Sequence, residues 1–365
     1  MPKTNEDLTV STQDPASKNS VKSIFFSAMR ILISFGALGI VIYMFRSKMG
    51  DVGHILATAK WHFFTMAFVL YTGAFVLITL RLKLITAVQK VIISVKNLLS
   101  IGLIGIFFNN ILPSSIGGDA VKAYYAYRLT GKKMESFSAV FVDRILGLFT
   151  LITLALTALI FFRAELSNPK ITEAVIALTL ASLIILVFFG SRRIAGKLKI
   201  FSFLIPSKKL KEKIVNLYHS VYGYKKHPGI IISGLVLSFL SQTLFILTNF
   251  FMALSLNVDV PVWVFFILIP VIGAVSMAPS LNGLGVREGA YVYLFSHFCN
   301  PEKAFALSIL NYSLLIAFSI AGGLIYLTRN HVLFKEVVKV DVIEELSHFD
   351  EVQRSETIEK EEMTK

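Results

Sequence analysis

The run Asn-Asn-Ile-Leu-Pro-Ser-Ser-Ile-Gly-Gly-Asp at residues 109–119 and the run Pro-Ser-Leu-Asn-Gly-Leu-Gly-Val-Arg-Glu at residues 279–288 decide the fold of this chain. Each run ends a long apolar tract, which covers residues 98–118 in the first case and 260–286 in the second. Proline removes a backbone donor and glycine relaxes the helix, so we expect both helices to break here. In a membrane, broken backbone is tolerated only where protein buries it or where it lines a wet cavity.

The composition is that of a membrane protein. The 365 residues are 55% hydrophobic and 16% charged, with a mean hydropathy of +0.69, whereas soluble domains carry about 25% charged residues. Disorder, collagen, a small disulfide scaffold and an ordinary cytosolic enzyme are excluded. Because the apolar tracts are continuous and do not alternate with polar residues, a transmembrane barrel is excluded as well. The sequence predicts an all-α polytopic transmembrane helical bundle, with further spans at 24–45, 61–80, 145–162, 174–191, 227–258 and 304–328.

Loop charge predicts how the chain crosses the bilayer. Residues 192–226 hold ten Lys and Arg, which favours the cytoplasm for this segment. If residues 98–128 enter the membrane and return on the same side, the inner segments before the tail hold 20 Lys and Arg and the outer segments hold six. A full crossing would put the ten-base loop outside. We therefore expect a re-entrant hairpin at 98–128. If residues 262–296 also form a re-entrant hairpin, the chain consists of two units with the same order of elements and opposite orientation in the membrane, that is, two inverted-topology units.

This layout divides the chain into three parts. Residues 1–23 form a polar cytoplasmic segment, residues 24–329 form the transmembrane domain with its basic loop at 192–228, and residues 330–365 form an acidic cytoplasmic tail. No signal-peptide cleavage site follows the first apolar tract, so we expect a retained span. The expected location is the plasma or inner membrane, with both termini in the cytoplasm.

The two breaks resemble each other, as paired broken segments do in transporters with inverted repeats. A short helix restarts after each glycine pair, near Asp119 and near Val286. The first amides of a helix lack internal partners and carry partial positive charge, so two opposed helix starts predict a central anion site for a phosphate or carboxylate. The matching residues are Pro113 and Pro279, Ser114 and Ser280, Gly117 and Gly283, Lys122 and Arg287, and Tyr124 and Tyr291.

The candidate substrate-binding residues lie in the breaks and beside them. They are Asn110, Ser114, Gly117, Gly118, Asp119, Lys122, Asp143, Arg144, Ser280, Asn282, Gly283, Gly285, Arg287 and Glu288.

Structural alternatives stay open for these residues. Glycines also allow close helix packing, and Asp119 also suits a helix cap. Arg287 and Glu288 suit a mutual ion pair. Asp143 and Arg144 open the predicted span at 145–162; they do not face each other on a helix, so each is expected to pair elsewhere, with Lys122 or Asp119, or to lie at the membrane interface.

Several other chemistries find no support in the sequence. There is no Walker loop, no metal-ligand spacing of histidines and no βαβ unit around the glycine run at 283–289. We therefore expect no cofactor, no metal and no catalytic residue. The net charge is +13. Its basic residues lie beside the apolar tracts, so they are expected to orient the chain in the membrane and to attract anionic lipid, and not to bind nucleic acid.

Three motifs together resemble the membrane region of the lysylphosphatidylglycerol synthases, a flippase-like family. They are the run from Asn110 to Ala123, the group Val142-Asp143-Arg144 with Gly147, and the run from Pro279 to Glu288. The resemblance covers roughly residues 22–330 and implies a multi-span bundle that in some members moves a modified phospholipid between leaflets. Lys122 stands where arginine is commoner in the family. The soluble aminoacyl-transferase domain of the synthases is absent after residue 330, so we do not expect lysyl transfer by this chain alone.

The leading functional hypothesis is a transporter or flippase for an anionic phospholipid or a lipid-linked envelope intermediate. The alternative is an accessory subunit or an enzyme of a membrane glycosyltransfer or lipid-modification pathway, and a third hypothesis is a scaffold without transport. The expected partners are membrane lipids with anionic head groups, together with envelope-lipid biosynthetic enzymes.

Overall fold

The computed structural model describes most of the chain between residues 32 and 328. The described residues are 32, 35–36, 38–40, 42–112, 117–166, 168–190, 222–277, 280 and 282–328. Several predicted features therefore lie outside them, namely the segment 1–23, the start of the first span, the basic loop up to residue 221, the tail 330–365, Pro113, Ser114 and Pro279. Every regular element of the described residues is a helix.

Four of the described helices have the length and composition to cross a membrane. They are α3 (Trp61–Val88), the helical stretch Lys133–Glu165, which joins α6 (Lys133–Phe162) to η2 (Arg163–Glu165), α10 (Pro228–Ser255) and the helix Pro301–Thr328. They hold 28 to 33 residues, more than the roughly 20 needed to span hydrocarbon. The prediction of an all-helical membrane bundle is confirmed.

Two predicted boundaries are wrong. The span predicted at 61–80 continues as α3 to Val88, and the span predicted at 145–162 begins as α6 at Lys133. Arg81 inside α3 pairs with Asp143 inside α6, and Arg144 of α6 pairs with Asp119. Hydropathy counts each charge as exposed and therefore ends both helices too early.

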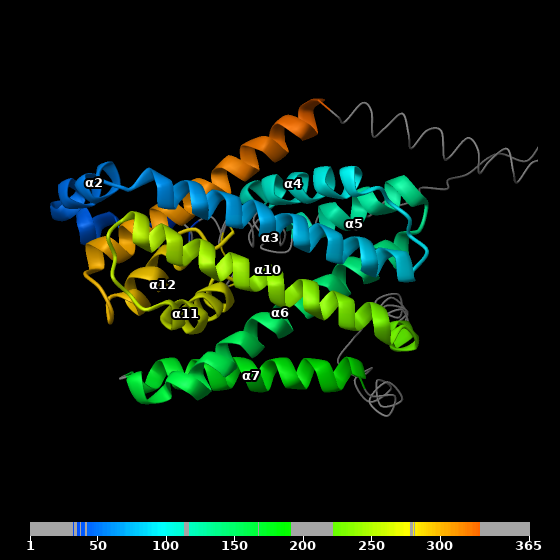
Figure 1. Ribbon diagram of the computed structural model, residues 1–365. Helices are drawn as coiled ribbons and strands as arrows, with labels where there is room; N and C mark the ends of the chain where they lie inside the picture. Colours follow the sequence, from blue (N-terminus) through cyan, green and yellow to red (C-terminus); the bar gives the residue numbers. More distant parts are fainter. Residues whose placement is uncertain are drawn as a thin grey trace, which may run out of the picture.

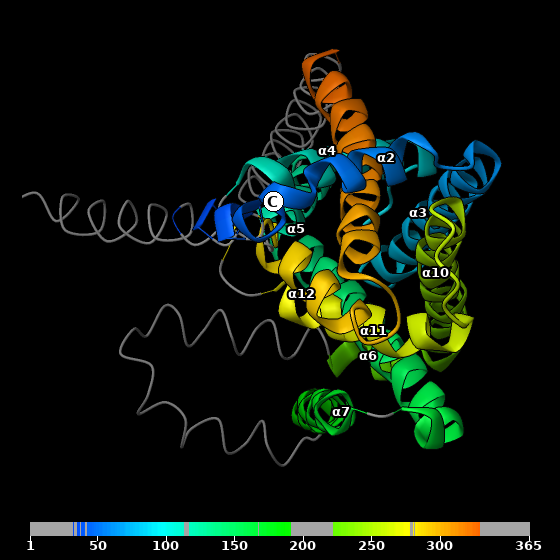
Figure 2. The same cartoon turned by 90° about the vertical axis from the view of Figure 1, so that its left-hand side faces the viewer.

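Helices α3 and α10 form an antiparallel pair on one flank of the bundle (Figure 1 and Figure 2). The Lys60 amide before α3 donates to the Ser255 carbonyl at the end of α10, at 2.8 Å. Further along, Arg81 Nη1 of α3 donates to Ser238 Oγ of α10, also at 2.8 Å. The residue numbers fall on α10 as they rise on α3, so the two helices run in opposite directions.

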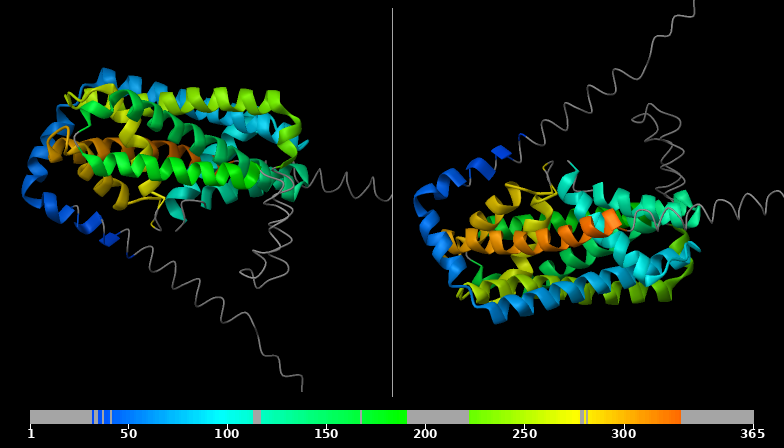
Figure 3. Two further views of the ribbon diagram at one scale, coloured as in Figure 1. Left: turned by 90° about the horizontal axis from the view of Figure 1, so that it is seen from below. Right: turned by 90° about the horizontal axis from the view of Figure 1, so that it is seen from above.

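The remaining helices pack on one side of this pair (Figure 2), and the long helices lie mostly along one axis (Figure 3). Helix α6 crosses beneath the pair and contacts both of its members. Helix α7 (Pro169–Gly190) packs on α6 and α11 at the edge of the bundle, where Figure 2 shows it end-on. The shorter elements are η1 (Arg46–Lys48), α2 (Met49–Ala57) and η3 (Tyr224–Lys226).

Both predicted breaks are present. The first separates α4 (Val95–Ile111) from α5 (Gly117–Thr130), and the second separates α11 (Val262–Val275) from α12 (Val286–Phe295). Each helix packs against its partner across the break. At the second break the backbone turns through left-handed conformations, with φ of 47° at Asn282 and 79° at Gly283 and Gly285, where glycine is favoured.

Close backbone contacts hold the helix Pro301–Thr328 against α4. A Cβ placed on Gly322 would lie 2.0 Å from the Leu103 carbonyl oxygen, so glycine alone fits at this contact. Small residues let transmembrane helices approach in this way, since lipid provides no hydrophobic driving force between them.

Gly322→Ala is expected to lower the free energy of unfolding by about 1–3 kcal/mol, the usual cost of overpacking. The matched control is Gly229→Ala in the first turn of α10, where an added Cβ meets nothing within 4 Å. Thermal unfolding of the purified proteins in detergent measures both, and equal stabilities of the two variants would contradict the close contact at Gly322.

Candidate functional site

A cluster of three charged side chains forms at the start of α5. Asp119 pairs with both of the others: its Oδ1 lies 3.1 Å from Lys122 Nζ, and its Oδ2 lies 3.3 Å from Arg144 Nη1 of α6. Lys122 is three residues from Asp119, the spacing that brings side chains together on a helix. Pairing with Asp119 was one of the alternatives expected for Arg144, and it is the one present in the structure. One acid and two bases leave this cluster with a net charge of +1.

A second ion pair links α3 to α6 and was not predicted. Arg81 Nε donates to Asp143 Oδ1 at 2.6 Å, and the Arg81 side chain is 4% exposed. The predicted span at 61–80 ends before Arg81, and Asp143 was expected to pair with a residue such as Lys122 or to lie at the membrane interface. The pairing of Asp143 with Arg81 differs from both expectations. Asp143 lies inside α6, where it faces α3 while its neighbour Arg144 faces α5. The signal in the sequence was that apolar residues continue after Arg81 at the spacing of a helix, which indicates that the helix also continues.

The charges of the second break pair with each other. Arg287 Nη2 lies 2.9 Å from Glu288 Oε1, and the second oxygen of Glu288 accepts the Gly285 amide at 2.6 Å. The Arg287 guanidinium stands over the Tyr312 ring, 4.8 Å from its centroid. Both charged residues are buried. The mutual ion pair anticipated as the structural alternative is therefore present, and the contact of Glu288 with the Gly285 amide is a helix cap that was not predicted. A substrate role for these two residues stays a prediction.

One amide at the start of each restarted helix is bonded to a side chain. The Gly118 amide donates to Asn109 Oδ1 at 2.7 Å, as the Gly285 amide donates to Glu288. A Cβ on Gly118 would lie 2.1 Å from the Gly105 carbonyl oxygen, so this glycine also serves close helix packing. The prediction was that free amides at the two helix starts bind an anion. The amides of Gly118 and Gly285 are not free for this role.

The two breaks nevertheless meet. Asn282 Nδ2 donates to Asn110 Oδ1 across 172 residues of sequence. The Nδ2 of Asn110 is buried and has no hydrogen-bond partner among the described residues. Of the other predicted residues, Ser280 is buried beside the second break, Gly117 lies against Leu112, and Ser114 lies outside the described residues.

A buried network of side-chain amide and phenol groups lies behind the second break and was not predicted from the sequence. Asn249 Oδ1 of α10 accepts the Tyr291 hydroxyl at 2.6 Å and Asn311 Nδ2 at 2.9 Å. The three residues are at most 5% exposed. Isolated polar residues in apolar tracts were the signal, because a buried polar group needs a partner.

An apolar cavity of about 580 Å³ opens beside the first cluster, between α5, α6, α7 and α11. Asp119 and Arg144 line it, and almost all of the remaining surface is apolar. Leu148 and Phe141 of α6 and Met277 of the α11 end are among the lining residues. The volume lies within the roughly 300–1,000 Å³ of ligand pockets. No group of three metal-ligating side chains occurs among the described residues.

Comparison with known proteins places the chain in a family. The model of the lysylphosphatidylglycerol synthase TM region matches residues 27–323. The chain belongs to this family. The resemblance that the three motifs indicated is thereby confirmed.

Relatives of this lysylphosphatidylglycerol synthase TM region protein occur in archaea. A "UPF0104 membrane protein" of Methanothermobacter thermautotrophicus is 26% identical over 55% of the chain, and the match spans 65% of that relative's own length. "UPF0104 membrane protein MJ1595" of Methanocaldococcus jannaschii is 28% identical over 59% of the chain and 69% of its own length. No solved structure matches the chain.

Arg81→Gln is expected to cost about 3 kcal/mol of stability, because it leaves the Asp143 carboxylate unpaired in the protein interior. Combining it with Asp143→Asn removes that charge and is expected to recover most of the loss. Chemical unfolding in detergent, read as a double-mutant cycle, measures the coupling; additive losses would show that the two groups do not interact.

Asn110→Cys with Asn282→Cys is expected to form a cross-link on oxidation or with a short bifunctional thiol reagent. The background is Cys299→Ala, which removes the chain's one cysteine. Burial raises the pKa of the Cys299 thiol to about 11, so this residue reacts slowly in any case. The control pair, Asn110→Cys with Thr58→Cys, is expected to stay open. Equal cross-linking of both pairs would refute the contact between the breaks.

Proposed function

We propose that this protein moves an anionic lipid, or a lipid-linked intermediate, between the leaflets of the cell membrane. The observation that carries the proposal is the apolar cavity of about 580 Å³ lined at one place by Asp119 and Arg144. An apolar wall suits an acyl or prenyl chain, and a charged end suits a head group. A lipid is the class of molecule that joins these two parts.

The charge balance favours an anionic head group. Arg81 with Asp143 and Arg287 with Glu288 are neutral pairs. The Asp119 cluster carries one cation more than its acid neutralises. Arg144 is the member of this cluster with the most exposed side chain, 40%, so it can reach a phosphate, which a guanidinium binds with two hydrogen bonds.

The arrangement of the helices supports an inverted repeat with two re-entrant hairpins. In the predicted layout α3 and α10 occupy equivalent places in the two units, and they run antiparallel. The helix pairs α4–α5 and α11–α12 are also equivalent, and their breaks meet at Asn110 and Asn282. Transporters of this construction bind their substrate where the broken segments of the two repeats come together.

Transport is tested with the purified protein in liposomes that contain a labelled lipid in one leaflet. Phosphatidylglycerol is expected to exchange between leaflets faster than phosphatidylcholine. Leu148→Trp fills the cavity and is expected to reduce exchange about tenfold or more, since removing substrate space costs over 1.4 kcal/mol. Ile160→Trp, on the same helix but 68% exposed, is the control and is expected to exchange lipid normally.

The charged end is tested in the same assay. Arg144→Gln is expected to lower exchange of phosphatidylglycerol and to remove its advantage over phosphatidylcholine. Absence of leaflet exchange for every anionic lipid, in folded protein, would overturn the proposal. The competing hypothesis of a lipid-modifying enzyme would then be favoured by product formation that Asp119→Asn abolishes.

A further inference from the structure

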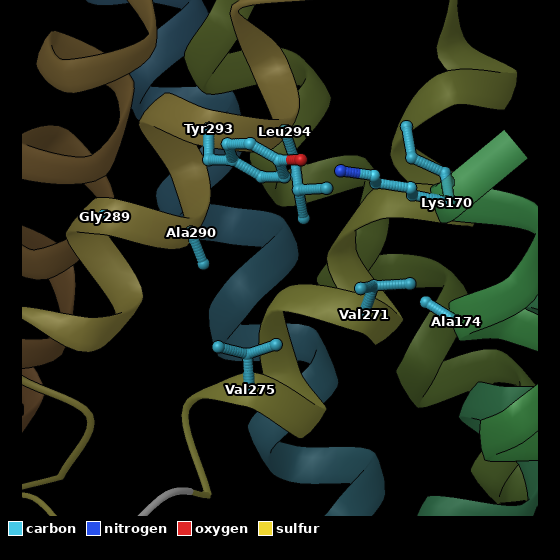
Figure 4. A pocket seen from close by; sticks show the side chains of 9 residues that line it. Lys170, Ala174, Val271, Val275, Gly289, Ala290, Tyr293 and Leu294 are labelled. Carbon is cyan, nitrogen blue, oxygen red and sulfur yellow. The ribbon is translucent and has the colours of Figure 1, made fainter. Parts of the chain in front are cut away.

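We infer that the protein has a second lipid-binding site, in the cavity between α7, α11 and α12, where Lys170 binds the phosphate of an anionic phospholipid. This cavity has a volume of about 350 Å³ and its surface is almost entirely apolar (Figure 4). The inference rests on the proposed lipid transport and names another place on the path of the same substrate.

The walls of this cavity suit a hydrocarbon chain. Val271 and Val275 of α11 face Ala174 of α7 across it, while Gly289 and Ala290 of α12 leave room by their small size. No acidic residue lines the cavity. The occupant of such a space inside a membrane bundle is the acyl chain of a lipid, since no other apolar molecule is present there at comparable concentration.

The rim of the cavity suits a phosphate. Lys170 is exposed, and no hydrogen bond or ion pair of its ammonium group occurs within the described part of the chain. In Figure 4 this group and the Tyr293 hydroxyl point toward each other. The Tyr293 ring stacks edge-on against His297, 5.6 Å away, and His297 hydrogen-bonds Asn168 at 2.9 Å. Lysine and tyrosine are both donors for phosphate oxygens.

The two cavities adjoin neighbouring faces of the end of α11. Val271 and Val275 of α11 line the smaller cavity, whereas Ala274 and Met277 line the larger. Helix α7 lines both, from Lys170 at the smaller cavity to Ser182 at the larger. These two residues are about 18 Å apart along the helix, at 1.5 Å for each residue. In this proposal Lys170 is the cationic group that the lipid meets at the second cavity.

A photoreactive residue at Ala174 tests the site directly, in vesicles that contain labelled phosphatidylglycerol or phosphatidylcholine. We expect cross-links to phosphatidylglycerol in excess over phosphatidylcholine. The same photoreactive residue at Ile184, which lies on α7 and is 69% exposed, samples the surrounding bilayer and is expected to label both lipids in proportion to their amounts.

Two substitutions complete the test. Lys170→Gln is expected to reduce the phosphatidylglycerol cross-link at Ala174 about tenfold, the effect of losing a charge-assisted hydrogen bond, and Ala290→Trp is expected to abolish cross-links to both lipids. Lys60→Gln, which changes an exposed lysine outside the cavity, is expected to change nothing.

The failure of this inference differs from the failure of the proposed function. Equal labelling of the two lipids at Ala174, insensitive to Lys170→Gln and Ala290→Trp, overturns the second site even if Leu148→Trp still blocks exchange. Selective labelling at Ala174 in a protein that exchanges no lipid supports the site and overturns transport.

Discussion

Backbone that leaves a helix inside an apolar bundle must find its hydrogen-bond partners in the protein, and the structure depends on this constraint at two places. The amide of Gly118 is satisfied by Asn109, and the amide of Gly285 by Glu288. The two breaks then meet through the side-chain amides of Asn110 and Asn282. Polar side chains at both breaks therefore take the place of the helical hydrogen bonds that the backbone loses there.

The same reasoning orders the buried charges. An unpaired ion in apolar surroundings is costly, so each buried cation lies against an acid. Arg81 of α3 is neutralised by Asp143 of α6, which joins two helices, and Arg287 is neutralised by Glu288 within α12. The cluster at Asp119 differs because two cations share one carboxylate beside a large apolar cavity. This difference is the reason that we propose the Asp119 cluster, and not the two ion pairs, as the place that receives a ligand.

Much of the architecture could be predicted from local features. Long apolar tracts predicted the membrane helices, and proline with glycine predicted both breaks, because these residues change the backbone itself. The pairing of Arg144 with Asp119 was among the expected ones. Arg81 was assigned to a loop, because hydropathy cannot count a partner that lies 62 residues away. The amide network around Asn249 was missed for the same reason.

The sequence by itself determined the helical membrane class, the family and the positions at which two helices stop, since each depends on residues that are neighbours in the chain. Only the tertiary structure decided which charges neutralise one another and where space is left between helices. Glu288 became a cap and ion-pair partner, while Asp119 came to line a cavity built from four helices. Pairing and empty space are properties of surfaces distant in sequence, so packing alone assigns them.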